Sequence, residues 1–459
     1  MDVLSIPFMD PVAAFSPWAD QPWAMLLDSA AFHPDRGRYA FIAADPFQTL
    51  VSTGDKVLLD GRPAGADPFA VLARELARWP HPRAPVPVPF AGGAVGLIGY
   101  EAGRYLERAQ VRHRLPAGQP DMALGFYDVV AAFDLEDRRA WVIAARPEAE
   151  GRAAGMAERI GRAGGSPMVP PSCPPLRWRS ELSRDAYRGK VRRILDYIRA
   201  GDVFQVNMTQ RFLADRPEGF SDFAAYRLLR DANPAPFAAF LRLGDAMTVI
   251  GASPERFLSL SAQGAIETRP IKGTCRRAAT AEADHALAVA LAASRKDRAE
   301  NLMITDLMRN DIGRSAEIGS VRVPTFAGVE TYASVHHLVS VVEARLRRGL
   351  GPVDLLRGAF PGGSVTGAPK VRALEIIDEL EVAPRGPYCG TVGWIGFDGA
   401  MDSNIVIRTV VSAGGRLITQ AGGAIVADSD PEAEHAEMVT KARPALSALS
   451  TEDETCWFG

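Results

Sequence analysis

The chain is organised around the segment Glu267-Thr268-Arg269-Pro270-Ile271-Lys272-Gly273-Thr274. Pro270 fixes its own φ and favours extended geometry at the residue before it, while Gly273 allows another group to approach the backbone closely. Lys272 is therefore held on a stiff strand end and left uncovered by its neighbours. The segment alone fits a surface lysine at a tight turn as well as a reactive lysine in a site, so the surrounding sequence must decide.

Length, composition and charge are those of an ordinary globular protein. The 459 residues are 47% hydrophobic and 23% charged, which is enough for two or three average domains or for one large unit. The net charge of −3 gives no indication of a nucleic-acid or polyanion partner.

Cysteine use and the N-terminus indicate the compartment. The four cysteines form no CxxC pair and share no metal-binding spacing with the seven histidines. This is typical of reduced thiols rather than of disulfides or a zinc site. The N-terminus lacks the basic start and long apolar core of a secretory signal, and no apolar run approaches the roughly 20 residues of a membrane helix. We expect a soluble cytoplasmic protein.

Short β-type runs broken by Pro and Gly fill the first part of the chain. We expect strands over 24–27, 39–43, 48–52 and 56–59, a helix at about 67–79, a stiff proline-rich connector over 80–89, and a hairpin of strands 123–134 and 139–145. The segment Phe90–Glu101 contains GGxxG but lacks the strand-and-helix frame of a dinucleotide site. Close packing of a glycine-rich strand is the better interpretation.

A segment rich in proline and glycine, Gly164–Pro175, predicts a linker between regions 1–165 and 176–459. Beyond it we expect helices over 183–200, with Ser183 as N-cap, and 222–231, and strands over 203–212, 237–243, 247–251, 256–260 and 265–271. Mostly antiparallel strands with long intervening helices indicate an α+β fold with packed sheets rather than a doubly wound parallel sheet.

Two predicted helices carry acidic residues three positions apart. The helix at about 295–310, capped by Ser294, carries Asp297 and Glu300, and the helix that begins at Asp430-Pro431 carries Glu434, Glu437 and Lys441 on one face. Carboxylates from two converging helices could hold Mg²⁺, which takes one or two carboxylates plus waters and substrate oxygens. The alternative, and the more common one for such pairs, is two solvated helix faces.

Three further segments suggest anion binding. Arg408 lies in Ile405–Val411, which otherwise reads as a buried strand, and its planar fork suits a carboxylate. Gly422-Gly423 follows the next predicted strand, and Pro361–Lys370 is a glycine-rich loop that leads into a helix. Free backbone N–H groups at such places favour anions. The alternatives are an internal salt bridge for Arg408 and simple turn geometry for the glycines.

Together these segments resemble the chorismate-utilising enzymes over nearly the whole chain. The family's motifs are matched by Ser253–Phe257, Thr268–Thr274, Glu300–Met303, Asp306–Asp311, Pro361–Lys370 and the segment around Arg408. The resemblance implies a large α+β unit in which two antiparallel sheets pack as a sandwich with helices outside. Region 1–165 would be an anthranilate-synthase-I-like part, packed as one unit with the chorismate-binding catalytic region 176–459.

Two positions distinguish the branches of this family. Lys272 stands where anthranilate synthases have alanine, and Gln205 stands where isochorismate and salicylate synthases have a lysine that activates water. The resemblance therefore implies formation of 4-amino-4-deoxychorismate, for p-aminobenzoate and folate synthesis, with ammonia supplied by a glutamine amidotransferase partner. Anthranilate formation and a non-catalytic tryptophan-binding regulatory subunit are the alternatives.

The resemblance also implies roles for individual residues. Lys272 would form a covalent adduct with chorismate and Glu255 would donate a proton. Mg²⁺ would be held by Glu300 and Glu437, with Asp297 and Glu434 acting through water. The expected chorismate contacts are Gly273, Thr274, His337, Ser364, Tyr388, Arg408, Gly422, Gly423 and Lys441. A tryptophan pocket is expected from Leu26–Ser29 and Asn233–Phe237, with Ser29, Pro236 and Phe237 as its marks, although Asp28 and Ala235 depart from common family residues.

Overall fold

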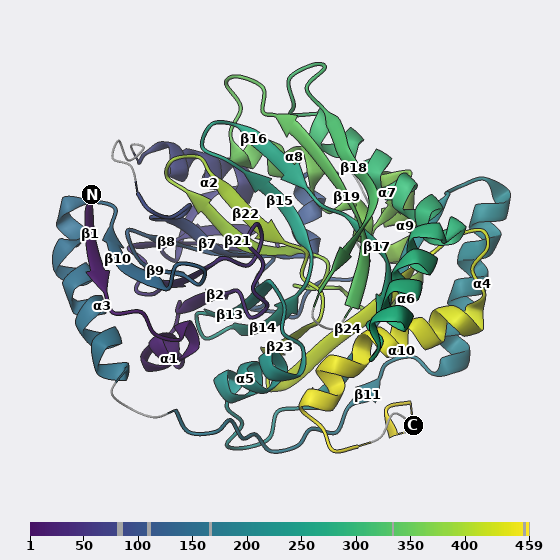
Figure 1. Ribbon diagram of the computed structural model, residues 1–459, viewed down its shortest axis with the longest axis horizontal. Coiled ribbons are helices and arrows are strands. Elements are labelled where there is room, and N and C mark those ends of the chain that lie inside the picture. Colours follow the sequence, from purple (N-terminus) through teal and green to yellow (C-terminus); the bar gives the residue numbers. More distant parts are fainter. Residues whose placement is uncertain (80–85, 108–111, 165–167, 333–334, 453–455, 459) are drawn as a thin grey trace.

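The computed structural model describes residues 1–459 except 80–85, 108–111, 165–167, 333–334, 453–455 and 459. Its strands form two large sheets of antiparallel neighbours, and Figure 1 shows helices lying around the outside of these sheets. The expected α+β sandwich is confirmed. No helix in the described part of the chain is both long and apolar enough to cross a membrane.

The first sheet has the strand order β1-β10-β9-β3-β2-β13-β14-β23-β24-β12-β11, with β20 also paired to β12. The five strands that precede residue 165 are adjacent to one another, and among the described residues only the β2–β13 pair joins them to the later strands. The bounds are β1 (Asp2–Ile6), β2 (Met25–Asp28), β3 (Tyr39–Ala43), β9 (Val129–Asp134), β10 (Arg139–Ala144), β11 (Arg179–Ser180), β12 (Gln205–Asp215), β13 (Phe237–Leu243), β14 (Met247–Ser253), β20 (Gly367–Ala368), β23 (Thr409–Ala413) and β24 (Arg416–Ile425).

The second sheet has the order β17-β19-β16-β15-β22-β21-β7-β8-β4-β5-β6, with β18 also paired to β19. Here too the early strands are contiguous, and they meet the later ones at the β7–β21 pair. The bounds are β4 (Gln48–Thr53), β5 (Lys56–Leu59), β6 (Arg62–Gly65), β7 (Gly93–Ile98), β8 (Met122–Tyr127), β15 (Arg256–Leu260), β16 (Ala265–Thr268), β17 (Ile271–Arg276), β18 (Arg322–Thr331), β19 (Val335–Arg345), β21 (Thr391–Gly396) and β22 (Met401–Asn404).

Hydrophobic clusters account for the layers. One lies between the two sheets and includes Phe41, Trp141 and Trp394. The others pack helices onto the outer faces: α1, α3, α4, α5, α9 and α10 on the first sheet, and α2, α7 and α8 on the second. The helices are α1 (Pro11–Phe15), α2 (Pro68–Ala77), α3 (Glu150–Ala163), α4 (Arg184–Ala200), α5 (Asp222–Ala232), α6 (Ala281–Ala293), α7 (Arg295–Gly313), α8 (Pro352–Ala359), α9 (Lys370–Leu380) and α10 (Pro431–Ala448).

Local signals in the sequence fix several elements as expected. The Ser183 side chain caps α4, and Gly201 ends that helix with φ 83°. In the glycine-rich strand β7, a Cβ at Gly93 would lie 2.0 Å from the carbonyl oxygen of Ile395. Close packing, rather than phosphate binding, therefore explains why this position needs glycine.

Two strand predictions are wrong. Residues 123–134 are not one strand: β8 and β9 separate at Asp128 and enter different sheets. The predicted strand 265–271 is interrupted after Thr268, and β17 begins at Ile271, because Pro270 has no N–H to donate to a neighbouring strand. Lys272 therefore lies within β17 rather than at the end of a strand.

Two predictions near the expected anion sites are also corrected. Arg408 is not inside a buried strand: β23 begins at Thr409, and Arg408 itself has φ 54°, in the left-handed region. Gly422-Gly423 does not follow a strand but lies within β24, paired with β12. A positive φ is uncommon for a residue other than glycine, so Arg408 occupies an unusual backbone position just before β23.

The expected linker and connector are only partly visible. Residues 168–178 form neither helix nor strand, in agreement with the linker, whereas 165–167 lie outside the described residues. Residues 80–85 of the proline-rich connector also lie outside them. The division of the chain into regions 1–165 and 176–459 stays a prediction.

Candidate active site

Lys272 lies on β17, at the edge of the second sheet. Its Nζ is 3.5 Å from the carbonyl oxygen of Ser364, in the glycine-rich loop that precedes α9. Burial is the main cause that lowers the pKa of Lys272, and the charge of Lys441 lowers it further. Because loss of hydration disfavours the ammonium form, this lysine is shifted towards the neutral, nucleophilic amine.

Glu255 lies in the short connection between β14 and β15 and is buried. Its carbonyl oxygen accepts from the backbone N–H of Ile405 at 3.0 Å. Burial raises the pKa of Glu255 to about 7, against the opposing influences of Lys272 and a hydrogen bond with Ser364. A carboxyl that keeps its proton near neutral pH can serve as a general acid.

Gly363 packs the loop between α8 and α9 closely against α7. A Cβ at Gly363 would lie 2.4 Å from Leu307 Cδ2, so a larger residue would require the Leu307 side chain to move. Arg385, which is nearly fully buried, donates to the carbonyl oxygens of Val365 at 2.8 Å and Asn207 at 2.9 Å. The loop is therefore held in one conformation beside Lys272.

Acidic side chains of α7 and α10 face one another. Burial raises the pKa of Glu300, and the carboxylates of Glu437 and Asp297 raise it further, against Lys272 and Lys296. Carboxylates brought together in this way repel one another unless a cation lies between them. Figure 1 shows α10 running alongside β24, which presents the second group of acids to the site.

Glycines let strand backbones approach these carboxylates. A Cβ at Gly423 would lie 3.2 Å from Glu434 Oε2 and 3.8 Å from Glu437 Oε1. On the opposite side, a Cβ at Gly273 would lie 3.0 Å from the Cβ of Asp297. Each glycine therefore brings the backbone of its strand against the acids of one helix.

Lys441 completes the α10 side of the site. Its Nζ lies 2.6 Å from Glu437 Oε1 and donates to the carbonyl oxygen of Gly422 at 3.1 Å. Glu434 is buried, and its Oε1 accepts from Ser429 Oγ at 2.6 Å.

The donor set fits Mg²⁺ shared with a substrate. In the described part of the chain, no three His, Cys, Asp or Glu side chains are grouped as a metal site. Mg²⁺ does not need such a cage, because it keeps several waters and uses one or two carboxylates together with substrate oxygens. Glu300 and Glu437 supply two hard oxygen ligands, and no soft ligand belongs to this group.

Arg408 and His337 provide polar groups that face the same region. No hydrogen bond or ion pair joins the Arg408 guanidinium to another residue within the described ranges. His337 Nδ1 lies 2.7 Å from Thr274 Oγ1, and burial lowers the pKa of His337 to about 4. Tyr388 is buried nearby, and its charge influence reaches Arg408. A guanidinium without a protein partner is a natural site for a carboxylate.

The residues expected to bind tryptophan come together elsewhere, where β2 pairs with β13. The backbone N–H of Ala31 donates to the carbonyl oxygen of Ala235 at 3.2 Å, which brings the segment after Ser29 against Pro236 and Phe237. Ser29 Oγ donates to the carbonyl oxygen of Tyr39 at 2.6 Å.

Some residues that shape the site were missed from the sequence. Arg385 and the buried pair Lys370–Asp311, whose Nζ–Oδ2 distance is 2.8 Å, hold the two ends of the glycine-rich loop. Lys370 and Asp311 each stand in a segment that matches a family motif, but neither residue type nor spacing assigned a role to them or to Arg385. Their partners lie far away in the sequence, so no spacing pattern points to the pairs.

Comparison with known proteins identifies the family. The family model described as chorismate binding enzyme matches residues 27–447, so the chain belongs to that family of chorismate-binding enzymes. Aminodeoxychorismate synthase component 1 of Klebsiella aerogenes is 45% identical over 460 residues, which cover 98% of this chain and 99% of that protein. Anthranilate synthase component 1 of Thermus thermophilus is 40% identical over 449 residues, covering 96% and 95%.

A solved structure agrees with the fold. Anthranilate synthase component I from Streptococcus pneumoniae TIGR4 superposes with a TM-score of 0.79 at 32% sequence identity. The superposition covers 90% of this chain and 93% of that one. The sandwich described above is therefore the architecture of this family.

Proposed function

We propose that this chain converts chorismate and ammonia into 4-amino-4-deoxychorismate, a precursor of p-aminobenzoate and folate. Similarity to aminodeoxychorismate synthase component 1 over nearly its full length supports this activity. The observation that carries the proposal is Lys272, whose pKa is lowered, coupled to Glu255, whose pKa is raised to about 7. Free thiols at all four cysteines suit a cytoplasmic location.

Substrate binding follows from the charges. Arg408, Lys441 and the backbone of Gly273, Thr274, Gly422 and Gly423 would receive the carboxylates of chorismate, with His337, Ser364 and Tyr388 beside the ring. Glu300 and Glu437 would hold Mg²⁺, with Asp297 and Glu434 acting through water. When bound, Mg²⁺ supplies positive charge that balances these acids and a substrate carboxylate.

The first half of the reaction uses Lys272 as a nucleophile. Its neutral Nζ forms a bond to C2 of the ring, the two conjugated ring double bonds shift, and the bond from C4 to its hydroxyl oxygen breaks. Glu255 gives its proton to that oxygen, which leaves as water. One difficult substitution is thereby divided into two easier steps.

In the second half ammonia replaces the lysine. Ammonia forms a bond to C4, the two double bonds shift back, and the C2–Nζ bond breaks, so Lys272 leaves as an amine. The proton released from the new ammonium group returns to the Glu255 carboxylate. The sum is chorismate plus ammonia giving aminodeoxychorismate plus water.

Product analysis tests this function directly. With chorismate, Mg²⁺ and ammonium salt, the purified chain should form aminodeoxychorismate, which a lyase converts to p-aminobenzoate. Fluorescent anthranilate as the main product would instead favour the activity named for the anthranilate synthase relatives.

Ammonia supply is the next expectation. We propose a glutamine amidotransferase subunit as the partner, in line with the name component 1 of the relative. Ammonium salt alone should support turnover, and the total ammonium needed for half-maximal rate should fall as the pH rises, because a larger fraction is then free ammonia. Glutamine should do so only after the partner is added. Product formed from glutamine by the highly purified single chain would contradict this expectation.

A further part of the proposal is a tryptophan site at Ser29, Pro236 and Phe237. Calorimetry with tryptophan tests it. Tryptophan binding without any turnover of chorismate in Mg²⁺ and ammonium would support a regulatory subunit in place of an enzyme.

The pKa of Glu255 gives a pH prediction. Because Glu255 must be protonated to act, and burial raises its pKa to about 7, adduct formation without ammonia should slow as the pH rises through about 7. Glu255→Gln should slow this step by about 10²–10⁴-fold and remove that alkaline limb. Stopped-flow mixing with chorismate, at several pH values, measures both effects.

Glu282→Gln is the matched control, since Glu282 is exposed on α6. This variant should keep the wild-type rate and pH profile. A Glu255→Gln variant that forms the adduct at the wild-type rate would remove Glu255 from the mechanism.

A further inference from the structure

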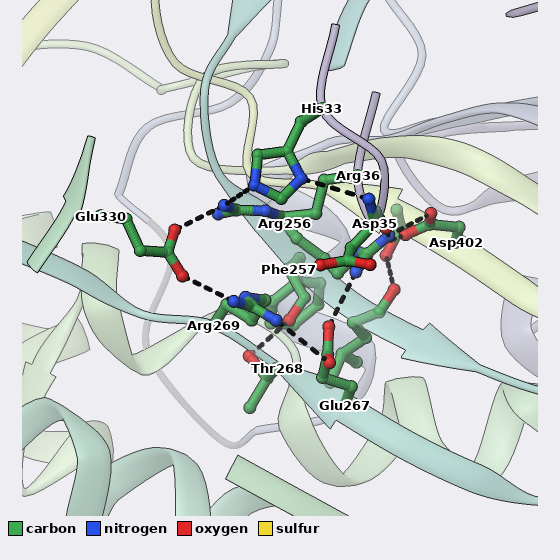
Figure 2. Close-up of polar contacts among 12 residues, drawn as sticks. His33, Asp35, Arg36, Arg256, Phe257, Glu267, Thr268, Arg269, Glu330 and Asp402 are labelled. Atoms are coloured by element: carbon green, nitrogen blue, oxygen red, sulfur yellow. Dashed lines mark hydrogen bonds and ion pairs between the residues drawn. The ribbon is translucent and has the colours of Figure 1, made fainter. Parts of the chain in front are cut away.

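A network of ion pairs joins the loop between β2 and β3 to the second sheet (Figure 2). Arg36, whose side chain is only 2% exposed, donates to Glu330 Oε2 at 2.5 Å. The other carboxylate oxygen of Glu330 accepts from Arg269 at 2.6 Å. Since Arg269 stands three residues before Lys272, one carboxylate ties the early loop to the strand that carries the reactive lysine.

Tyr332 connects this network to the active site. The Arg36 guanidinium lies 5.3 Å from the centroid of the Tyr332 ring, and the Tyr332 hydroxyl donates to Glu330 Oε2 at 3.0 Å. The Tyr332 ring also meets the His337 ring edge to face, with centroids 5.2 Å apart. Thr274 holds His337 by its Nδ1. His337 is therefore confined between Tyr332 and Thr274.

The loop itself is fixed so that Arg36 keeps its direction. His33 Nε2 lies 2.9 Å from Arg36 Nη2, and the carbonyl oxygen of Asp35 accepts from Arg256 at 3.2 Å (Figure 2). Arg256 is in turn paired with Asp402 at 2.9 Å. Burying an arginine in this way contributes little to stability by itself, because desolvation offsets the ion pair.

We propose that Arg36 is a positioning residue for the reaction at Lys272, and that it acts through Tyr332 and Glu330 to fix the His337 imidazole beside the substrate. This inference rests on the proposed function, in which His337 lies next to the chorismate ring. Arg36 touches neither substrate nor reacting atoms, and it stands 236 positions before Lys272 in the sequence.

Charge adds to this positioning role. Burial is the main cause of the low pKa of His337; Arg36 and Arg408 lower it further, while Glu330 raises it. Titratable side chains on the elements packed against β19 include Lys272 and Cys275 on β17, Glu267 on β16, Asp284 on α6, Lys296, Asp297 and Glu300 on α7, and Tyr332 after β18, and His336 is the neighbour of His337 on β19 itself. A neutral imidazole leaves Arg408 free to attract a carboxylate and can still form a hydrogen bond.

The test replaces Arg36 by methionine, which keeps an unbranched apolar stem and removes the charged guanidinium. Product formation should fall by about 10–100-fold in kcat, as for residues that orient a catalytic group, with little change in KM. In the free protein labelled with ¹³C-histidine, the pKa of His337 measured by NMR titration should rise. The cation that lowers this pKa is lost, and the negative charge of Glu330, which raises it, is no longer balanced by Arg36. His337→Gln assigns the resonance.

Matched variants separate positioning from a structural role. Arg38→Met is the control. Arg38 stands two residues after Arg36 in the same loop, but it pairs with Asp134, at 2.6 Å, and not with Glu330. This variant should leave kcat and the His337 titration unchanged. Arg36→Lys should recover part of the activity by restoring the charge next to Glu330. Tyr332→Leu breaks the contact with the His337 ring and should reproduce the fall in kcat, while the pKa of His337 stays closer to that of the wild type because Arg36 and Glu330 remain paired.

The outcomes are decisive even if the main variant does not fold, because Tyr332→Leu leaves the pair of Arg36 and Glu330 in place. A folded Arg36→Met protein with the wild-type kcat and the wild-type His337 pKa would overturn the proposal, and so would a folded Tyr332→Leu protein with the wild-type kcat. The proposal would also be overturned if Arg36→Met lowered only the melting temperature, by as much as Arg38→Met does, and left kcat and the His337 pKa unchanged. The titration needs no turnover, so it decides this inference separately from the product assay that tests the function.

Discussion

Lys272→Ala should reduce formation of aminodeoxychorismate by at least about 10³-fold, because the reaction loses its nucleophile. If ammonia replaced the C4 hydroxyl directly, the reaction would not need an amine at position 272. Binding of chorismate in the presence of Mg²⁺ should survive, since the expected carboxylate contacts are unchanged. Lys272→Arg should be no better than alanine, because a guanidinium stays protonated.

Intact-protein mass spectrometry provides the direct measurement. Without ammonia, the wild-type chain should gain the mass of chorismate less one water. After proteolytic digestion, the same mass increase should be found on the peptide that contains Lys272. Lys56→Ala is the control, since Lys56 is exposed on β5 and should leave both adduct and turnover intact. An alanine variant at position 272 with near wild-type turnover would reduce the lysine to an electrostatic contact.

Glu300→Gln and Glu437→Gln should each abolish most activity at low Mg²⁺. Each change removes one charged oxygen ligand while it preserves side-chain shape, so the fold should be unaffected. We expect the Mg²⁺ concentration for half-maximal activity to rise by more than about tenfold. Measuring turnover at increasing Mg²⁺ concentrations gives this half-maximal concentration. Calorimetry of Mg²⁺-dependent chorismate binding tests the same ligands without turnover.

The first turn of α10 offers the control for these two variants. Glu432 pairs with Arg184 on α4, away from the acids that face β24, so Glu432→Gln should keep the wild-type Mg²⁺ requirement. Normal turnover of both Glu300→Gln and Glu437→Gln at low Mg²⁺ would refute the metal assignment.

The sequence was a good guide wherever local chemistry decides. Caps at Ser183 and Ser294 set the starts of α4 and α7. The succession of mostly antiparallel strands with long intervening helices predicted the packed sheets. It failed at Asp128 and Arg408, where the chain changes sheets or adopts a positive φ. Nothing in residue type or periodicity marks such points, because they depend on which strands are neighbours in space.

The candidate site shows the same limit. The acids of α7 and α10 could be identified because helical spacing puts them on one face. Arg36 and Glu330 could not, since 294 positions separate the two halves of their ion pair. For Arg385 the contacts likewise run to distant carbonyl groups, Val365 and Asn207. Pairs of this kind become visible only after the chain is folded.

The strand orders of the two sheets have a thermodynamic consequence. In each sheet the early strands form one block and the later strands another, and in the part of the chain that the structure describes a single strand pair joins them: β2–β13 in one sheet and β7–β21 in the other. Ser29 and Pro236 lie on opposite sides of the first of these seams. A small molecule bound between them would hold both blocks, so its binding free energy would add to the stability of the whole fold, and the melting temperature would rise with ligand concentration.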